Sequence, residues 1–160
     1  HEHHARGAGR LAQGLHEAAQ AAEGSDVYLC VETHDAYCRA DDLMEVVTAA
    51  DHDHVKVCWD IMHPVTHGMD MCEAFEHVKD DVLHCHIHDG IRPDDPEQTT
   101  WDMCPTGEGD IPHKEAIKLL LGIDFDGALS GEWFTDFDPD EILPQNVRVL
   151  TDYIVQLHNG

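Results

Sequence analysis

The feature that most constrains the fold is a set of short apolar runs, each separated from the next by a helix-length segment. The runs lie at 27–32, 55–60, 82–88 and 128–133, and they are rich in Val, Leu and Cys. Their length and composition are typical of β-strands. Strands that alternate with helices form parallel sheets joined by helical crossovers. We therefore expect an α/β fold with a parallel sheet.

The segments between and around these runs show helical spacing of apolar residues. The first predicted helix covers residues 1–24 and stops at Gly24. A long segment rich in Pro, Asp, Gly and Thr, residues 89–110, is predicted to be a loop. Because Asp is a preferred helix cap and Pro is tolerated in the first turn, the remaining helices are predicted to begin at Asp41 or Asp42, near Gly68, at Pro112 and at Pro139.

The third run has an unusual alternation. Its even positions are the imidazoles of His84, His86 and His88, whereas its odd positions are the apolar Leu83, Cys85 and Ile87. Successive side chains of a strand point to opposite faces. One face can therefore pack against helices while the other directs histidines, the commonest metal ligands, into a site.

Each predicted strand ends in a side chain that can bind a metal. The candidates are Glu32, Asp60, His86 or His88, and Glu132. In every strand the candidate lies on the more polar or smaller-residue face, and active sites of parallel β/α proteins are built at the carboxyl ends of the strands. A set of three carboxylates and one imidazole suits Mn²⁺ or Mg²⁺, with Co²⁺ also suitable, better than a structural Zn²⁺.

The net charge limits the classes of partner that the chain can bind. The chain carries 33 acidic and 9 basic residues, a net charge of −24. Such a surface repels phosphate backbones, so we expect no nucleic-acid partner. The apolar runs are too short for a membrane span. The acidic residues are spread along the chain, which favours a halophile's cytoplasmic protein; an acidic mesophilic protein is the alternative.

The six cysteines are scattered and form no Cys-x-x-Cys pair. This spacing argues against a zinc finger or a disulfide framework. Three of them, Cys30, Cys58 and Cys85, lie within predicted strands, where cysteine behaves as a small buried hydrophobe. We expect reduced thiols and a cytoplasmic location.

Several motifs together resemble the xylose isomerase-like sugar phosphate isomerase/epimerase superfamily. They are Val-Tyr-Leu-Cys-Val-Glu-Thr-His (27–34), Trp-Asp-Ile-Met-His (59–63), His-Ile-His-Asp (86–89), Gly-Glu-Gly-Asp-Ile-Pro (107–112) and Gly-Ala-Leu-Ser-Gly-Glu (127–132). The resemblance implies a (β/α)8 TIM barrel, of which residues 1–160 would be a single domain matching strands five to eight. A full barrel needs about 250 residues, so the N-terminal half would be missing, or two half-barrels would pair as a homo-oligomer. The first helix begins without a cap, which indicates an interior cut rather than a purification-tag remnant.

The resemblance also implies roles for individual residues. Glu32, Asp60, His86 and Glu132 match the metal ligands of the superfamily, and the two glutamates match the residues that move the proton. His63 and Arg92 match substrate-contacting positions. His88 stands where the usual His-x-Lys-Asp motif has lysine, and it is assigned to substrate binding as well.

The reaction implied is metal-dependent isomerisation or epimerisation of a sugar, sugar phosphate or cyclitol. A divalent ion would stabilise an enediolate, one carboxylate would remove the proton beside the carbonyl, and the other would return it. Ketose 3-epimerases have a second glutamate where this chain has Cys38, which argues against that reaction. The Glu-Thr-His form is closer to members that act on inososes, hydroxypyruvate or dehydroshikimate.

Three alternatives remain open from the sequence. A dehydratase of the same fold would use the same metal to eliminate water. An enzyme of the endonuclease IV type shares this barrel, but the acidic charge and the lack of a basic groove argue against it. A non-catalytic half-barrel fragment, or a metal-binding module, is the third.

Overall fold

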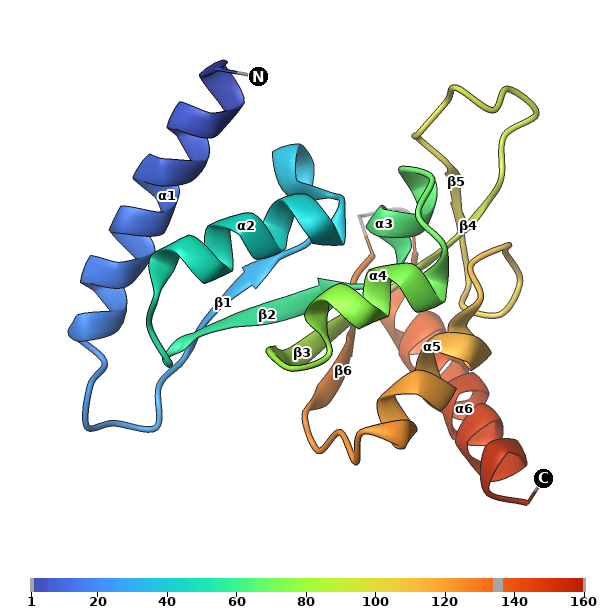
Figure 1. Ribbon diagram of the computed structural model, residues 1–160. Helices are drawn as coiled ribbons and strands as arrows, with labels where there is room; N and C mark the ends of the chain where they lie inside the picture. The colour runs from blue at the N-terminus through green and yellow to red at the C-terminus, as the bar shows by residue number, and fades with distance from the viewer. Residues whose placement is uncertain (1, 134–136, 160) are drawn as a thin grey trace.

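The computed structural model describes residues 2–133 and 137–159 (Figure 1). Its centre is a four-stranded parallel sheet with the order β1-β2-β3-β6. The strands are β1 (Leu29–Glu32), β2 (Val55–Asp60), β3 (Val82–Ile87) and β6 (Ala128–Gly131). The predicted α/β fold with a parallel sheet is confirmed. The first strand begins two residues later than predicted, because Val27 and Tyr28 are exposed (59% and 45%) before the ladder starts.

Helices pack against one face of this sheet. They are α1 (Glu2–Gln20), α2 (Ala40–Ala50), α4 (Met71–Val78), α5 (His113–Gly122) and α6 (Pro139–His158). Figure 1 shows α2, α4 and α5 side by side, with α1 next to α2 and α6 next to α5. Between them and the sheet lies one core that includes the fully buried Trp59, Leu43 and Val57. None of the helices in the described ranges is both long and apolar enough to cross a membrane.

The structure corrects two predicted helix starts. Helix α2 begins at Ala40 after Arg39, so Asp41 and Asp42 lie in its first turn, where their charge favours the helix dipole, rather than at the cap. Helix α4 begins at Met71 instead of near Gly68. Its cap is Asp70, whose carboxylate accepts hydrogen bonds from the backbone N–H groups of Cys72 and Glu73.

Two short helices were not predicted: the 3-10 helix η1 (Asp35–Tyr37) and the helix α3 (Met62–Thr66). Both follow directly after a strand end. Each has five residues or fewer, which is too short to show a helical period in the sequence.

The predicted faces of β3 are wrong at one residue. Val57 pairs with Val82 but Cys58 pairs with His84, so Leu83 is an extra residue at a bulge. Leu83 is 36% exposed and lines an open cavity together with His84. It therefore lies on the face opposite the helices, whereas Cys85 and Ile87 are fully buried as expected.

The face away from the helices is the more open one. It carries the exposed side chains of Cys30, Leu83 and Ala128. In a closed barrel the corresponding face is the interior, filled by side chains from all strands. All six cysteines of the chain are free thiols, as expected.

The predicted loop 89–110 is not wholly irregular. It contains a small antiparallel sheet of β4 (Asp89–Ile91) and β5 (Asp102–Cys104). The alternation in these strands covers only three residues each, so it gave no signal in a segment rich in Pro and Asp.

A single buried carboxylate holds this segment to the end of β3. The side chain of Asp89 is fully buried. Its Oδ1 accepts hydrogen bonds from the N–H groups of Gly90 (2.8 Å) and Ile111 (3.2 Å), and its Oδ2 accepts from Gly107 (2.8 Å) and Gly109 (3.0 Å). Both oxygens of Asp89 therefore have backbone hydrogen-bond donors.

Two glycines make this arrangement sterically possible. Gly107 has a φ of 89°, a conformation that other residues rarely adopt. A Cβ atom at Gly109 would lie only 2.3 Å from Oδ1 of Asp89. The predicted turn at 107–109 is therefore a backbone cradle for Asp89, and it leads into α5 as expected.

The first test concerns Asp89. An Asp89→Asn substitution replaces one acceptor oxygen by an amide that itself donates, so two buried backbone N–H groups lose their partner. At about 1–3 kcal/mol for each unsatisfied group, we expect a loss of about 3 kcal/mol of unfolding free energy, measured by urea denaturation. The matched control is Asp94→Asn, an exposed aspartate in the same segment. Equal stability of the two variants would contradict this role of Asp89.

Candidate metal centre

The strand ends bring a compact group of ligands together. Four residues each offer one ligand atom, and these atoms all lie within 4.8 Å of one another: Glu32, Asp60, His86 and Glu132. The strand pairing explains the convergence. Asp60 pairs with His86 across β2 and β3, Glu32 ends β1, and the N–H of Glu132 donates to the carbonyl of Ile87 (3.0 Å) just after β6. The four predicted metal ligands are therefore neighbours in the structure.

His86 lies between the two glutamates. Its Nδ1 atom is 2.7 Å from Oε1 of Glu32 and 3.0 Å from Oε2 of Glu132. The two glutamate side chains are 27% and 36% exposed, so they are accessible from solvent. Glu32 also lines an open cavity on this face of the sheet.

Asp60 is held in one orientation by the start of α3. Its Oδ1 accepts hydrogen bonds from the N–H groups of Met62 (2.9 Å) and His63 (3.2 Å). Its Oδ2 therefore faces the other way, 2.6 Å from Nε2 of His88 and 3.8 Å from Nε2 of His63. The short helix α3, which the sequence did not reveal, fixes which oxygen of Asp60 is free.

The ionisation of this group follows from burial and charge. Burial acts to raise the pKa of Asp60, but the contact with His88 and the charge of that imidazole, with a smaller contribution from His63, outweigh it and hold the pKa below its ordinary value. Burial acts to lower the pKa of His88, but Asp60 raises it overall. Burial lowers the pKa of His63 below its ordinary value, which favours a neutral imidazole with a free lone pair.

Several polar atoms here are buried without a hydrogen-bond partner. They are Oδ2 of Asp60, Nε2 of His63, both ring nitrogens of His88 and Oε2 of Glu132. Nε2 of His88 lies 2.6 Å from Asp60 and Nδ1 of His86 lies 3.0 Å from Glu132, but neither contact has the geometry of a hydrogen bond. Buried polar atoms normally have partners, and each one without a partner costs free energy. A divalent cation would satisfy Oδ2 of Asp60 and Oε2 of Glu132, which belong to the four-ligand group, so the donor set fits a metal ion.

The three predicted substrate-binding residues lie in different surroundings. His63 contacts the group directly, and its ring also packs edge-on against His34 (4.6 Å between centroids) and His88 (5.3 Å). His88 is only 3% exposed and lies against Asp60.

Arg92 lies in a different place. It lines a cavity of about 680 Å³ formed by residues 65–70 and 92–101, and its guanidinium stacks on Trp101 at 5.1 Å from the ring centroid. None of the four ligand candidates lines this cavity.

A second group of potential ligands was missed from the sequence. Cys58, His84 and His86 offer ligand atoms within 4.8 Å of one another. Cys58 was read as a buried hydrophobe. The signal that could have revealed it is the two-residue period, because Cys58 and His84 share a face with Asp60 and His86 respectively.

The chain was also compared with known proteins. The model of the xylose isomerase-like TIM barrel family matches residues 2–153. No curated protein matched the sequence.

Several solved structures share the fold. A probable 3-DHS dehydratase, AsbF from Bacillus anthracis, superposes with a TM-score of 0.74 at 22% identity, over 88% of this chain and 55% of that one. An L-ribulose 3-epimerase gives a TM-score of 0.77 at 16% identity, over 95% and 55%. An IOLI protein with a bound zinc atom gives 0.73 at 19% identity, over 92% and 56%. The chain thus spans about half the length of these structures.

The second test concerns the buried pair of Asp60 and His88. A His88→Leu substitution leaves the buried Asp60 carboxylate without the imidazole that lies 2.6 Å from its Oδ2. Breaking a buried pair in this way costs about 3–5 kcal/mol, and we expect a loss of about 3 kcal/mol in urea unfolding with EDTA present. Adding Asp60→Asn should recover part of the loss. The control is His84→Leu, because His84 forms no ion pair or hydrogen bond with a carboxylate of the described residues; a His88→Leu loss no larger than this control would contradict the pairing.

Proposed function

The chain belongs to the xylose isomerase-like TIM barrel family, and we propose that its strand-end group is the metal centre of a sugar or cyclitol isomerase or epimerase. One observation carries the proposal. Three carboxylates and an imidazole converge at the carboxyl ends of parallel strands, with buried polar atoms that no protein group satisfies. The similar structures include an L-ribulose 3-epimerase and a probable 3-DHS dehydratase, which supports chemistry of this general class.

Glu32, Asp60, His86 and Glu132 would hold the ion. Their oxygen-rich set favours Mg²⁺ or Mn²⁺, with Co²⁺ or Zn²⁺ as alternatives; a zinc atom is bound in one similar structure. When bound, the ion supplies Lewis-acid stabilisation of the negative charge that develops on substrate oxygen atoms.

The protein's own groups would move the proton. Glu32 and Glu132 approach His86 from strands on opposite sides of β3. One carboxylate would accept the proton from the carbon beside a carbonyl, and the other would deliver a proton to the neighbouring or the same carbon. Their partial exposure allows a substrate to reach both.

Three further residues would position the metal ligands or the substrate. We assign His63 to a substrate hydroxyl, because its unpartnered Nε2 lies beside Asp60. His88 would act mainly by holding Asp60, since it is almost fully buried. Arg92 would bind a distant carboxylate or phosphate of the substrate from the cavity that it shares with Trp101.

A complete active site would also need the open inner face to be covered. This chain covers only 55% of each of two similar structures. We propose that residues 1–160 form one domain equivalent to the C-terminal half of a barrel. A second half, from the same protein or from a second copy of this chain, would then close the site.

A dehydratase is the second candidate, and the similarity to a probable 3-DHS dehydratase favours it. The proton would be removed by the same carboxylate. Instead of returning to carbon, it would leave with a hydroxyl group as water. The two reactions therefore differ in product and not in the residues that begin them.

The third test follows the abstracted proton. The metal-loaded protein is incubated in D₂O with a panel of ketoses, ketose phosphates and inososes, and mass spectrometry records the products. An isomerase or epimerase yields a product that carries deuterium on the carbon beside the carbonyl and has lost no water. A dehydratase yields a product that has lost water. Glu32→Gln and Glu132→Gln should each slow the reaction by about 10²–10⁴-fold. Glu45→Gln, an exposed glutamate of α2, should have no effect. Reaction rates unchanged in both site variants would contradict the assignment.

A further inference from the structure

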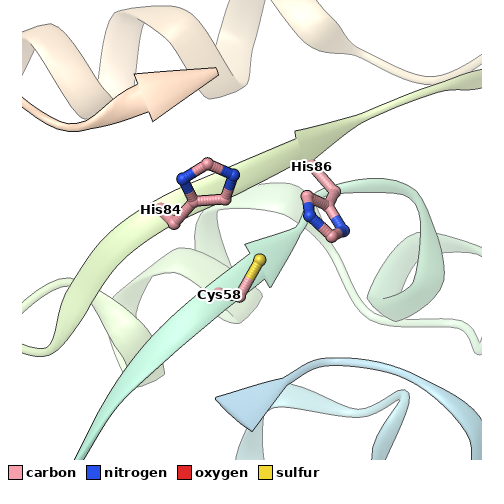
Figure 2. A group of neighbouring side chains, drawn as sticks. All are labelled: Cys58, His84 and His86. Atoms are coloured by element: carbon pink, nitrogen blue, oxygen red, sulfur yellow. The ribbon is translucent and has the colours of Figure 1, made fainter. Parts of the chain in front are cut away.

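Beside the carboxylate centre lies a second group with different chemistry. It consists of the thiol of Cys58 on β2 and the imidazoles of His84 and His86 on β3. Figure 2 shows the sulfur of Cys58 projecting from β2 toward the two rings. Cys58 and His84 are direct partners in the strand pairing, and the rings of His84 and His86 are 5.3 Å apart at 87°. The backbone of two adjacent strands therefore fixes all three side chains.

These side chains have open space beside them and few competing contacts. They line a cavity of about 360 Å³ together with Cys30, Glu32 and Leu83. Among the described residues, neither the Cys58 thiol nor the His84 ring forms a hydrogen bond. Their lone pairs are consequently available to a ligand from the cavity, and a water molecule or a small anion could approach the same point.

We propose that Cys58, His84 and His86 form a second metal site, selective for Zn²⁺ or a similar thiophilic ion. One thiolate and two imidazoles suit zinc, whereas the carboxylates at the strand ends suit harder ions. Three protein ligands beside an open cavity leave the fourth tetrahedral position to solvent or a small molecule. On binding, the S–H bond of Cys58 breaks, a Zn–S bond forms, and the proton passes to solvent.

His86 belongs to both the carboxylate centre and the second site. A neutral imidazole has one lone pair for a metal, because its other nitrogen carries the proton. His86 therefore serves one ion at a time. A thiophilic ion on Cys58 and His84 would withdraw His86 from the carboxylate centre, so the second site would inhibit the proposed activity.

Cobalt absorption tests the site without relying on activity. A Co²⁺–thiolate bond gives a charge-transfer band in the near ultraviolet, and carboxylates and imidazoles do not. We expect this band when Co²⁺ is added to the reduced protein. It should disappear in Cys58→Ser. In His84→Gln, which lacks one of the three ligands, the affinity for Co²⁺ should fall by about 10–100-fold. Loss of a group that only supports a metal ligand already has an effect of this size.

The matched control is Cys30→Ser, because Cys30 lines the same cavity but is outside the ligand group. It should keep the band. Circular dichroism checks that each variant is folded. The proposal is overturned if the native protein gives no band, if Cys58→Ser keeps it, if Cys30→Ser loses it, or if His84→Gln binds Co²⁺ as tightly as the native protein.

A last variant tests whether Cys58 and the carboxylates bind separate ions or the same ion. Glu132→Gln weakens only the carboxylate centre, so at a limiting amount of Co²⁺ it should strengthen the thiolate band. A weaker band in Glu132→Gln would mean that Cys58 binds the same ion as the carboxylates, and the separate site would be refuted. The band reports only the thiolate, so its absence would leave the proposed isomerase centre unaffected.

Discussion

The arrangement of the site depends on one electrostatic constraint: three carboxylates converge around a single imidazole at the ends of neighbouring strands. At such short separations like charges repel by an amount that only a counter-charge can offset. Within the protein, His88 supplies part of it by contacting Asp60, while the ring of His86 lies between Glu32 and Glu132. Oδ2 of Asp60 and Oε2 of Glu132 remain without hydrogen-bond partners, and under the proposed function a cation would complete the arrangement.

Two buried carboxylates with different roles make this convergence possible. Asp60 uses one oxygen to bind backbone N–H groups at the start of α3 and presents the other to the site. Asp89, three residues beyond His86, uses both oxygens to bind backbone donors of the 107–111 segment. Asp60 therefore keeps one oxygen for the site, whereas both oxygens of Asp89 are occupied by backbone hydrogen bonds. The difference lies in the number of backbone donors that each one meets.

The sequence predicted the strands and the ligand group because their signals are local and repeated. Each of Glu32, Asp60, His86 and Glu132 ends an apolar run, and parallel strands align their carboxyl ends. What it could not predict depends on contacts distant in sequence. The bulge that turns Leu83 to the open face arises from pairing with β2, and the separation of Arg92 from the ligand group arises from the path of 89–110. Cys58 is buried as predicted, but its place beside His84 and His86 depends on the pairing of β2 with β3, which a single sequence does not reveal.

The central claim is that the strand ends form a metal centre, and metal stoichiometry tests it most directly. The protein is purified in molar KCl, since its net charge of −24 calls for screening, and its metal content is measured by elemental analysis. We expect about one divalent ion per chain, bound through the strand-end ligands. The ion should be lost in an Asp60→Asn, Glu132→Gln double variant and retained in Glu45→Gln. Equal metal in the native protein and the double variant would contradict the claim, because it would place the metal on other groups.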